Sequence, residues 1–381
     1  MPTTTNDPTD ILEQAIEQAQ ARLSQPVITT SDSLEKVVYI ARCLTNRAGV
    51  RLILTCALAK IHRPELDIRK PYTEIGGTDS FSGRNDYDEA HVGQFATKHQ
   101  LPVNTTTAFL TPGFRTINVP LSPALTISGR PKRMYVYTIA LLDEVYKGRL
   151  TASDLLVELL RQLLLLKHEQ AERMQQLLET LQDSAHGIPL SSEDIVSLIE
   201  QHLKSPKSSR LPVLVVAAAY SAASKQLGEQ PKPLHAHTAA DRQTGALGDL
   251  EIRLIDDEQT VTSYEMKAKE VTKQDIDLAL QKVAGLAGRV DNYIFITTAK
   301  TDKDVIEYAT SLYRATGGIE FAVLDCIGFL RHFLHLFHRI RFDFLEAYQT
   351  LLLQEPDSAI SQPLKEAFLA LRRAAEIDSS V

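Results

Sequence analysis

The chain has 381 residues, of which 44% are hydrophobic and 23% charged, and its net charge is −7. This length allows two or more domains with hydrophobic cores, and the composition is that of a globular protein. The three cysteines, Cys43, Cys56 and Cys326, are far apart and form no CxxC pair, which argues against a structural zinc site and a secreted disulfide scaffold. We expect a cytoplasmic protein, because the sequence shows no signal peptide and no apolar run of about 20 residues.

The N-terminal part combines helices with a long irregular segment. Residues 9–24 and 32–60 carry apolar residues at helical spacing, whereas residues 70–130 are rich in Gly, Pro, Thr, Asn and Ser. Aromatic and aliphatic residues within 70–130 argue against disorder. Ordered irregular segments of this length are usually functional.

Charge is distributed unevenly along the chain. Between Ala90 and Ala140 there is no Asp or Glu, while five basic residues occur: Lys98, Arg115, Arg130, Lys132 and Arg133. A surface that faces a polyanion such as nucleic acid has this composition, because phosphates repel carboxylates. Chance clustering in loops is the alternative interpretation, and composition alone leaves both open.

Capping patterns predict where three helices begin. A Ser or Thr is followed three residues later by Asp at Thr151, Ser191 and Thr272. These patterns predict helices over 151–183, 191–204 and 272–286.

The C-terminal half alternates helices with strands. The patterns predict helices over 212–227 and 302–315, strands over 248–256, 261–269, 293–297 and 319–325, and helices from there to the end. The order α-β-β-α-β indicates an α/β (α+β) fold with a mixed central sheet flanked by helices.

Polar residues of the two alternating segments can meet on one face of this sheet. Residues i and i+2 of a strand share a face, and a hairpin around 256–260 would bring Asp249, Glu265 and Lys267 together. Two carboxylates can hold Mg²⁺, and an ammonium group can orient the attacking water and offset charge in phosphodiester hydrolysis. The alternative is an ordinary amphipathic hairpin with a solvated face. Glu251 and Gln281 could also reach the cluster, although a surface role fits each better.

Other chemistries lack their motifs. The sequence has no GxxxxGK[ST] phosphate loop, no GxGxxG after a strand, no HExxH and no zinc-deaminase pattern. The absence of [DN]PP[YF] argues against a DNA methyltransferase.

The spacing of Asp249, Glu265 and Lys267 resembles the PD-(D/E)xK nuclease superfamily, whose core has the element order α-β-β-β-α-β. Gly248 stands where that superfamily usually has a proline. The segments KPYTEIGGTDSFSGRNDYDE (70–89) and KHQLPVNTTTAFLTPGFR (98–115) resemble the N-terminal half of the SacI-type family of Type II restriction endonucleases. This resemblance extends over roughly residues 34–340.

The resemblance implies a homodimer that cleaves both strands of duplex DNA at a short palindromic site, with Mg²⁺ as cofactor. It implies that Asp249, Glu265 and Lys267 are catalytic and that Asp249 and Glu265 bind the metal. The side chains suited to DNA binding in the resembling segments are Arg84, Asn104, Thr105, Thr106 and Arg115. Each has a structural alternative, as turn or cap residues or, for Arg84, as a partner of Asp86 or Asp88.

These expectations divide the chain into three parts. We predict a helical and loop-rich DNA-recognition region at 1–205, a nuclease core at 206–325, and helices at 326–381 that pack on the core or at a dimer interface. The helices at 151–183 and 328–345 could each form that interface. A repair or junction nuclease with the same core, and a non-catalytic DNA-binding protein, are the competing hypotheses. A restriction enzyme would have a cognate DNA methyltransferase in the same system, without a stable complex.

Overall fold

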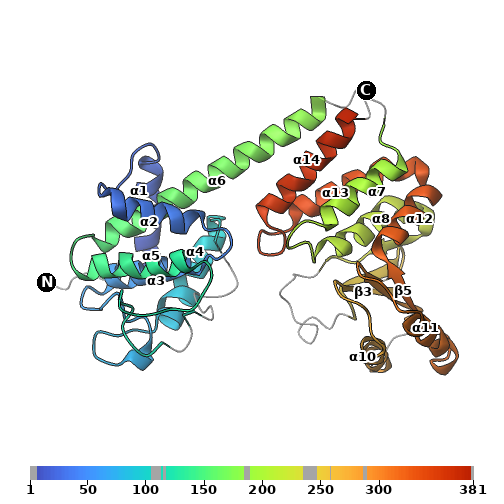
Figure 1. Ribbon diagram of the computed structural model, residues 1–381, viewed down its shortest axis with the longest axis horizontal. Coiled ribbons are helices and arrows are strands. Elements are labelled where there is room, and N and C mark those ends of the chain that lie inside the picture. Colours follow the sequence, from blue (N-terminus) through green and yellow to red (C-terminus); the bar gives the residue numbers. More distant parts are fainter. Residues whose placement is uncertain are drawn as a thin grey trace. The chain divides into compact units, whose positions relative to one another are not determined.

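The computed structural model describes residues 7–103, 113–114, 117–183, 189–234, 247–257, 259–285 and 290–378. The chain forms two compact units, unit 1 at Met1–Arg173 and unit 2 at Met174–Val381 (Figure 1). Within the described ranges, no helix has the length and apolar character needed to span a membrane.

Unit 1 is helical. Its described elements are α1 (Pro8–Ala21), α2 (Ser31–Arg42), α3 (Ala48–His62), η1 (Thr73–Ile75), η2 (Gly83–Val92), α4 (Gly93–Lys98), α5 (Lys132–Tyr146) and α6 (Ala152–Asp183), which continues into unit 2. The predicted helix start at Thr151 is confirmed, since the Thr151 hydroxyl accepts the N–H of Asp154 at 2.9 Å.

The helical stretch predicted over 32–60 is interrupted. α2 ends at Arg42 and α3 begins at Ala48, whose N–H donates to the side chain of Asn46 at 3.1 Å. A local bond of this kind competes with a continuous helix. α3 is buried on all sides from Ala48 to Ala59, so it forms the centre of unit 1.

The segment predicted to be irregular contains a helix of unusual pitch. η2 is a π-helix, and its buried residues are Gly83, Tyr87, Asp88 and Val92. This spacing of four to five residues differs from the 3.6-residue period of an α-helix, because π-helical hydrogen bonds join residue i to i+5. A search for helical spacing therefore misses it.

Unit 2 contains one five-stranded mixed sheet with helices on both sides. The strands are β1 (Glu229–Pro231), β2 (Leu250–Leu254), β3 (Thr260–Lys267), β4 (Asn292–Thr297) and β5 (Glu320–Asp325), in the order β1-β2-β3-β4-β5. The pairs β1–β2 and β2–β3 are antiparallel, whereas β3–β4 and β4–β5 are parallel. The helices are α7 (Ser192–Leu203), α8 (Leu211–Leu227), α10 (Lys273–Ala284), α11 (Lys303–Ala315), α12 (Cys326–Leu336), η3 (His338–Ile340), α13 (Arg341–Gln354) and α14 (Gln362–Asp378).

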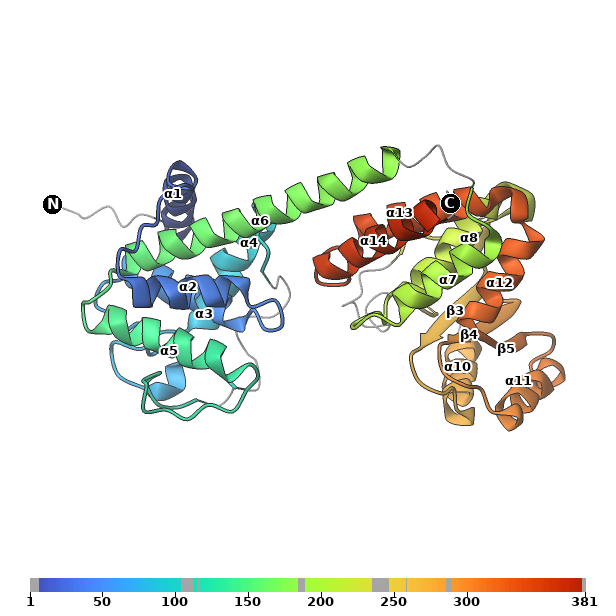
Figure 2. The same ribbon diagram turned by 45° about the horizontal axis from the view of Figure 1, so that its top comes forward.

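The two faces of the sheet belong to different cores. Figures 1 and 2 show α10 and α11 on one side and α8 and α13 on the other. Leu250, Ile252 and Tyr264 pack in the core that contains α8, while Tyr293 and Phe295 pack in the core that contains α10 and α11. The alternation of buried residues in β2 follows from the two-residue period of a strand.

The predicted mixed α and β organisation of the C-terminal half is confirmed. Capping boxes are present at Ser191 and Thr272, and the hairpin of β2 and β3 forms as expected. The structure adds β1, which pairs with β2 through Glu229, Gln230 and Pro231. Three residues ending in proline show no alternation, and proline is tolerated here because β1 is an edge strand. The described elements from α8 to β4 therefore follow the order α-β-β-β-α-β.

Candidate active site

The hairpin of β2 and β3 brings Asp249 and Glu265 to the same place. Leu250 pairs with Tyr264 in antiparallel register, so continuing the register by one residue places Asp249 opposite Glu265. Directly opposite residues of an antiparallel pair point to the same face. The Asp249 carboxylate also accepts the backbone N–H of Met266 at 2.7 Å, which fixes it at the end of β3.

Glu265 is surrounded by donors from three elements. Its Oε1 lies 3.2 Å from the ammonium nitrogen of Lys267 on the same strand. Its Oε2 lies 3.3 Å from the ammonium nitrogen of Lys282 on α10 and accepts the hydroxyl of Tyr293 on β4 at 2.8 Å. Glu265 is therefore the centre of the cluster formed by Asp249, Glu265, Lys267, Asp275 and Lys282, which we call the carboxylate–lysine cluster.

Lys267 lies between two carboxylates. Its ammonium nitrogen is 3.2 Å from Glu265 and 3.2 Å from Oδ1 of Asp275. Partial burial acts to lower the pKa of Lys267, but Glu265 and Asp275 raise it above its ordinary value overall. Asp275 is also the third residue of α10, and its other oxygen accepts the N–H and the hydroxyl of Thr272. Thr272, the N-cap of α10, therefore fixes the Asp275 carboxylate, and that carboxylate forms an ion pair with Lys267.

Burial acts to raise the pKa of Asp275, and the bonds from Thr272 and Lys267 lower it overall. The side chains of Glu265 and Lys267 are 18% and 29% exposed, and Asp249 is exposed. A cation or a phosphate group arriving from solvent can therefore reach the cluster, while the partial burial strengthens its electrostatic interactions.

Glu251 has a structural role beside the cluster. Its Oε1 accepts the N–H of Leu247 at 2.8 Å, and its Oε2 lies 2.9 Å from the hydroxyl of Thr260 and 3.1 Å from the ammonium nitrogen of Lys232. Burial acts to raise the pKa of Glu251, but these bonds lower it overall. The carboxylate therefore remains charged and ties β2 to its neighbours.

Gly248 explains the missing proline before Asp249. A Cβ atom at this position would lie 2.5 Å from the carbonyl oxygen of Tyr264 and 2.7 Å from the hydroxyl of Ser263. Real Cβ atoms do not approach backbone oxygen that closely. The backbone of β3 passes so near that only glycine fits.

Sequence reasoning missed two members of the site, Lys282 and Tyr293. The sequence favoured a surface role for Gln281, which is exposed, but gave no role to its neighbour Lys282, which reaches Glu265 from α10. The signal was the seven-residue spacing of Asp275 and Lys282, which places both on one face of a helix. For Tyr293 the signal was the hydroxyl of an otherwise apolar buried strand, since a buried tyrosine usually needs a polar partner.

The donor set fits a magnesium ion. Asp249, just before β2, and Glu265 on β3 offer carboxylate oxygens, and the cluster has three carboxylates against two ammonium groups, a net charge of −1 that favours a cation. Among the residues that the structure describes, no group of three or more His, Cys, Asp and Glu side chains is arranged around a metal position. Mg²⁺ is typically held by one or two carboxylates with water and substrate phosphate as its other ligands. Two carboxylates are therefore sufficient.

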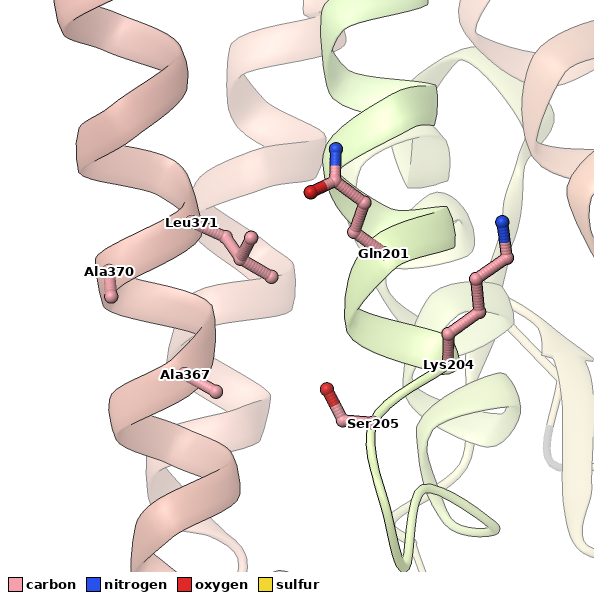
Figure 3. Close-up of a pocket in the computed structure, with 6 residues that line it drawn as sticks. All are labelled: Gln201, Lys204, Ser205, Ala367, Ala370 and Leu371. Carbon is pink, nitrogen blue, oxygen red and sulfur yellow. The ribbon is translucent and has the colours of Figure 1, made fainter.

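Unit 2 also has a groove of different character. It has a volume of ≈ 590 Å³ and lies between α7 and α14 (Figure 3). The residues that line it are Gln201, Lys204, Ser205, Ala367, Ala370 and Leu371. None of these is a carboxylate, so this groove lacks the ligands that a magnesium ion requires.

The predicted DNA-binding residues lie in unit 1, and one of them is described. Arg84 is on η2, its side chain is 54% exposed, and its Nε donates to Glu89 at 2.6 Å. The partner of Arg84 is therefore Glu89, not Asp86 or Asp88 as the sequence suggested. Asp88 faces α3, where Arg51 donates to it at 2.8 Å. The remaining four, Asn104, Thr105, Thr106 and Arg115, lie outside the described residues.

The acid-free stretch is partly neutralised by acids from other elements. Lys98 lies 2.9 Å from Glu13 on α1, and Arg133 lies 2.5 Å from Glu35 on α2. The net positive charge around Lys98 and Arg133 in the folded unit is therefore lower than the count over 90–140 implies.

The carboxylate–lysine cluster lies in the part of unit 2 that has known relatives. Residues 188–298 match the family model of the SacI restriction endonuclease C-terminal domain. The chain therefore carries a domain of a restriction endonuclease family, and the predicted resemblance to the SacI family is confirmed over these residues. The matched range includes all five residues of the cluster and Tyr293. None of the curated proteins matches the chain.

The SacI-family domain contains α7, α8, α10 and the strands β1 to β4. Restriction endonucleases are nucleases that act on DNA, so DNA is the substrate class that this family implies. The resembling segments at 70–89 and 98–115 lie outside the matched range, and their assignment stays a prediction.

Proposed function

We propose that the protein is a Type II restriction endonuclease. It hydrolyses both strands of duplex DNA at a short palindromic site, depends on Mg²⁺, and leaves 5′-phosphate and 3′-hydroxyl ends. The observation that carries the proposal is the convergence of Asp249, Glu265 and Lys267 within a restriction endonuclease domain.

The topology around the cluster supports a PD-(D/E)xK core. The elements that the structure describes from α8 to β4 follow the order α-β-β-β-α-β, with Asp249 immediately before β2 and Glu265 and Lys267 at the end of β3. These are the positions at which the superfamily has its acid and its E-x-K motif. The sequence patterns predicted only two strands between α8 and α10, and β1 is the strand that they missed.

We assign roles by chemistry. Asp249 and Glu265 would hold the Mg²⁺ ion, which when bound polarises the scissile phosphate and lowers the pKa of water. Lys267 would orient the attacking water and offset negative charge in the transition state through its ammonium group. Asp275 holds that group in place at 3.2 Å.

DNA recognition is assigned to unit 1. Arg84 presents an exposed guanidinium, a group that can bind guanine bidentately. Asn104, Thr105, Thr106 and Arg115 complete the proposed set. The cognate methyltransferase expected in the same system protects the host sites.

A palindromic site implies a homodimer, with one cluster for each strand. Among the described residues, Leu155 to Leu164 of α6 pack in the core of unit 1 and Leu181 packs in the core of unit 2, where apolar residues of α12 and α13 also pack, so neither of the two predicted interface helices is singled out. The dimer therefore rests on the symmetry of the site alone.

The assignment is tested with Asp249→Asn and Lys267→Ala. The amide oxygen that replaces the carboxylate in Asp249→Asn can still accept the N–H of Met266, so this variant removes the charge and keeps the local geometry. We expect each change to reduce cleavage by more than the about 10- to 100-fold that outer-shell substitutions cause. Specific duplex binding in Ca²⁺ should persist, which separates loss of chemistry from loss of folding.

Asp256→Asn is the matched control, because Asp256 is an exposed aspartate just after the other end of β2. It should cleave at the wild-type rate. Wild-type cleavage by Asp249→Asn or Lys267→Ala would remove the catalytic assignment, even if the protein proves to be a nuclease.

A further inference from the structure

Tyr293 is a buried residue whose single hydroxyl proton is shared between two acceptors in the candidate active site. Its side chain is fully buried in the core between the sheet and α10, where the ring lies 5.4 Å from that of Phe295 and 5.7 Å from that of Phe321. The hydroxyl lies 2.8 Å from Oε2 of Glu265 and 3.0 Å from the carbonyl oxygen of Leu247.

These two acceptors belong to the two halves of the proposed metal site. Glu265 supplies one carboxylate from β3, and Leu247 lies two residues before Asp249, which supplies the other. The N–H of Leu247 is held by Glu251 at 2.8 Å, so both polar groups of this residue's backbone are fixed. One hydroxyl on β4 thus links a ligand side chain to the chain segment that carries its counterpart.

We propose that Tyr293 is a positioning residue that holds Glu265 and the segment before Asp249 in the arrangement that binds the divalent cation. This inference rests on the proposed function. The hydroxyl donates to Oε2, which also faces Lys282, while Oε1 faces Lys267, so the hydroxyl helps to fix the rotation of the Glu265 carboxylate. Pre-ordering of this kind by outer-shell groups is a general determinant of metal affinity.

The alternative is that the hydroxyl only satisfies its own need for a polar partner in the core. A second tyrosine of the same sheet allows the two roles to be separated. Tyr264 on β3 is also buried, and its hydroxyl lies 2.9 Å from that of Tyr220, in the core on the opposite face of the sheet. Tyr264→Phe therefore removes a buried hydroxyl from the core that does not contain Tyr293.

The experiment is a calorimetric titration of the full-length protein with Mn²⁺ in the absence of DNA, for wild type, Tyr293→Phe and Tyr264→Phe. Phenylalanine keeps the ring contacts of both positions. We expect Tyr293→Phe to weaken Mn²⁺ binding by about 10- to 100-fold, and Tyr264→Phe to leave it unchanged. Thermal midpoints of both variants report the stability cost of a lost hydroxyl separately.

Equal Mn²⁺ affinities for the two variants would overturn the inference, as would a wild-type protein that binds no Mn²⁺. The proposed function fails differently. If Tyr293→Phe weakens Mn²⁺ binding but wild type cuts no duplex DNA, the positioning role stands and the nuclease assignment falls. If wild type cuts DNA and both variants need the same Mg²⁺ concentration, the nuclease stands without this role for Tyr293.

Discussion

The stability of unit 2 should depend on pH through one buried histidine. His202 on α7 is fully buried, with Nδ1 2.9 Å from the hydroxyl of Tyr348 and Nε2 2.9 Å from the carbonyl oxygen of Leu364. A carbonyl oxygen can only accept, so Nε2 carries the proton, and Nδ1 accepts from Tyr348. The neutral imidazole is therefore fully bonded, and a second proton would displace the bond from Tyr348.

Burial lowers the pKa of His202 from 6.5 to about 4, although its bond to Leu364 acts in the opposite direction. Between these two values the unfolded chain binds a proton that the folded chain does not bind. The contribution of His202 to the free energy of unfolding is therefore largest above pH 6.5, and it decreases as the pH is lowered toward 4. A difference of about 2.5 pKa units corresponds to about 3 kcal/mol, most of which is lost by pH 4.5.

Hydrogen exchange of backbone amides in α7 and α14 measures this local stability in the full-length chain, after correction for the intrinsic pH dependence of exchange. His202→Gln removes the titrating group, so the loss of unfolding free energy between pH 6.5 and pH 4.5 should be smaller than in wild type by about 2 kcal/mol. His332→Gln, an exposed histidine of α12, is the control and should behave as wild type. Parallel stability curves for wild type and His202→Gln would refute the reasoning.

Two further predictions concern the interaction with DNA. Arg84→Ala should cost about 1–3 kcal/mol of specific duplex affinity if Arg84 contacts a base. Arg63→Ala is the control and should cost none, because Arg63 is also an exposed arginine paired with a glutamate, Glu65, at 2.8 Å. An equal loss for Arg84→Ala on random DNA would instead indicate a phosphate contact. The second prediction is a dimer of chains on each site, measured by light scattering of the DNA complex and by direct conversion of plasmid to linear product. A 1:1 complex, with nicked circles accumulating first, would contradict the dimer and leave the nuclease core intact.

Local signals predicted most elements of unit 2 from the sequence. The capping boxes at Ser191 and Thr272 are complete within four residues, and the alternation of β2 and β3 is a property of each strand alone. The elements that were missed lack such signals. β1 is three residues long, and η2 follows a π-helical period instead of the α-helical one.

The residues of the candidate site likewise fall into those that the sequence predicted and those that it missed. Asp249, Glu265 and Lys267 could be brought together on paper because a single hairpin determines their register. Lys282 and Tyr293 come from α10 and β4, and their position depends on the parallel pairing of β3 with β4 and on the packing of α10 against the sheet. Local patterns mark both residues as polar groups on an element face or in a buried strand, but they do not place either beside Glu265, because that depends on contacts between elements that are separated along the chain.

We propose that this chain is a Mg²⁺-dependent, sequence-specific endonuclease. Incubating the protein with unmethylated phage DNA and Mg²⁺, followed by gel electrophoresis, tests it most directly. The account predicts discrete fragments with 5′-phosphate ends, no reaction in EDTA, and no fragments from Asp249→Asn. A smear or branch-dependent nicking would instead indicate a repair or junction nuclease, and intact DNA under all these conditions would indicate a non-catalytic DNA-binding protein.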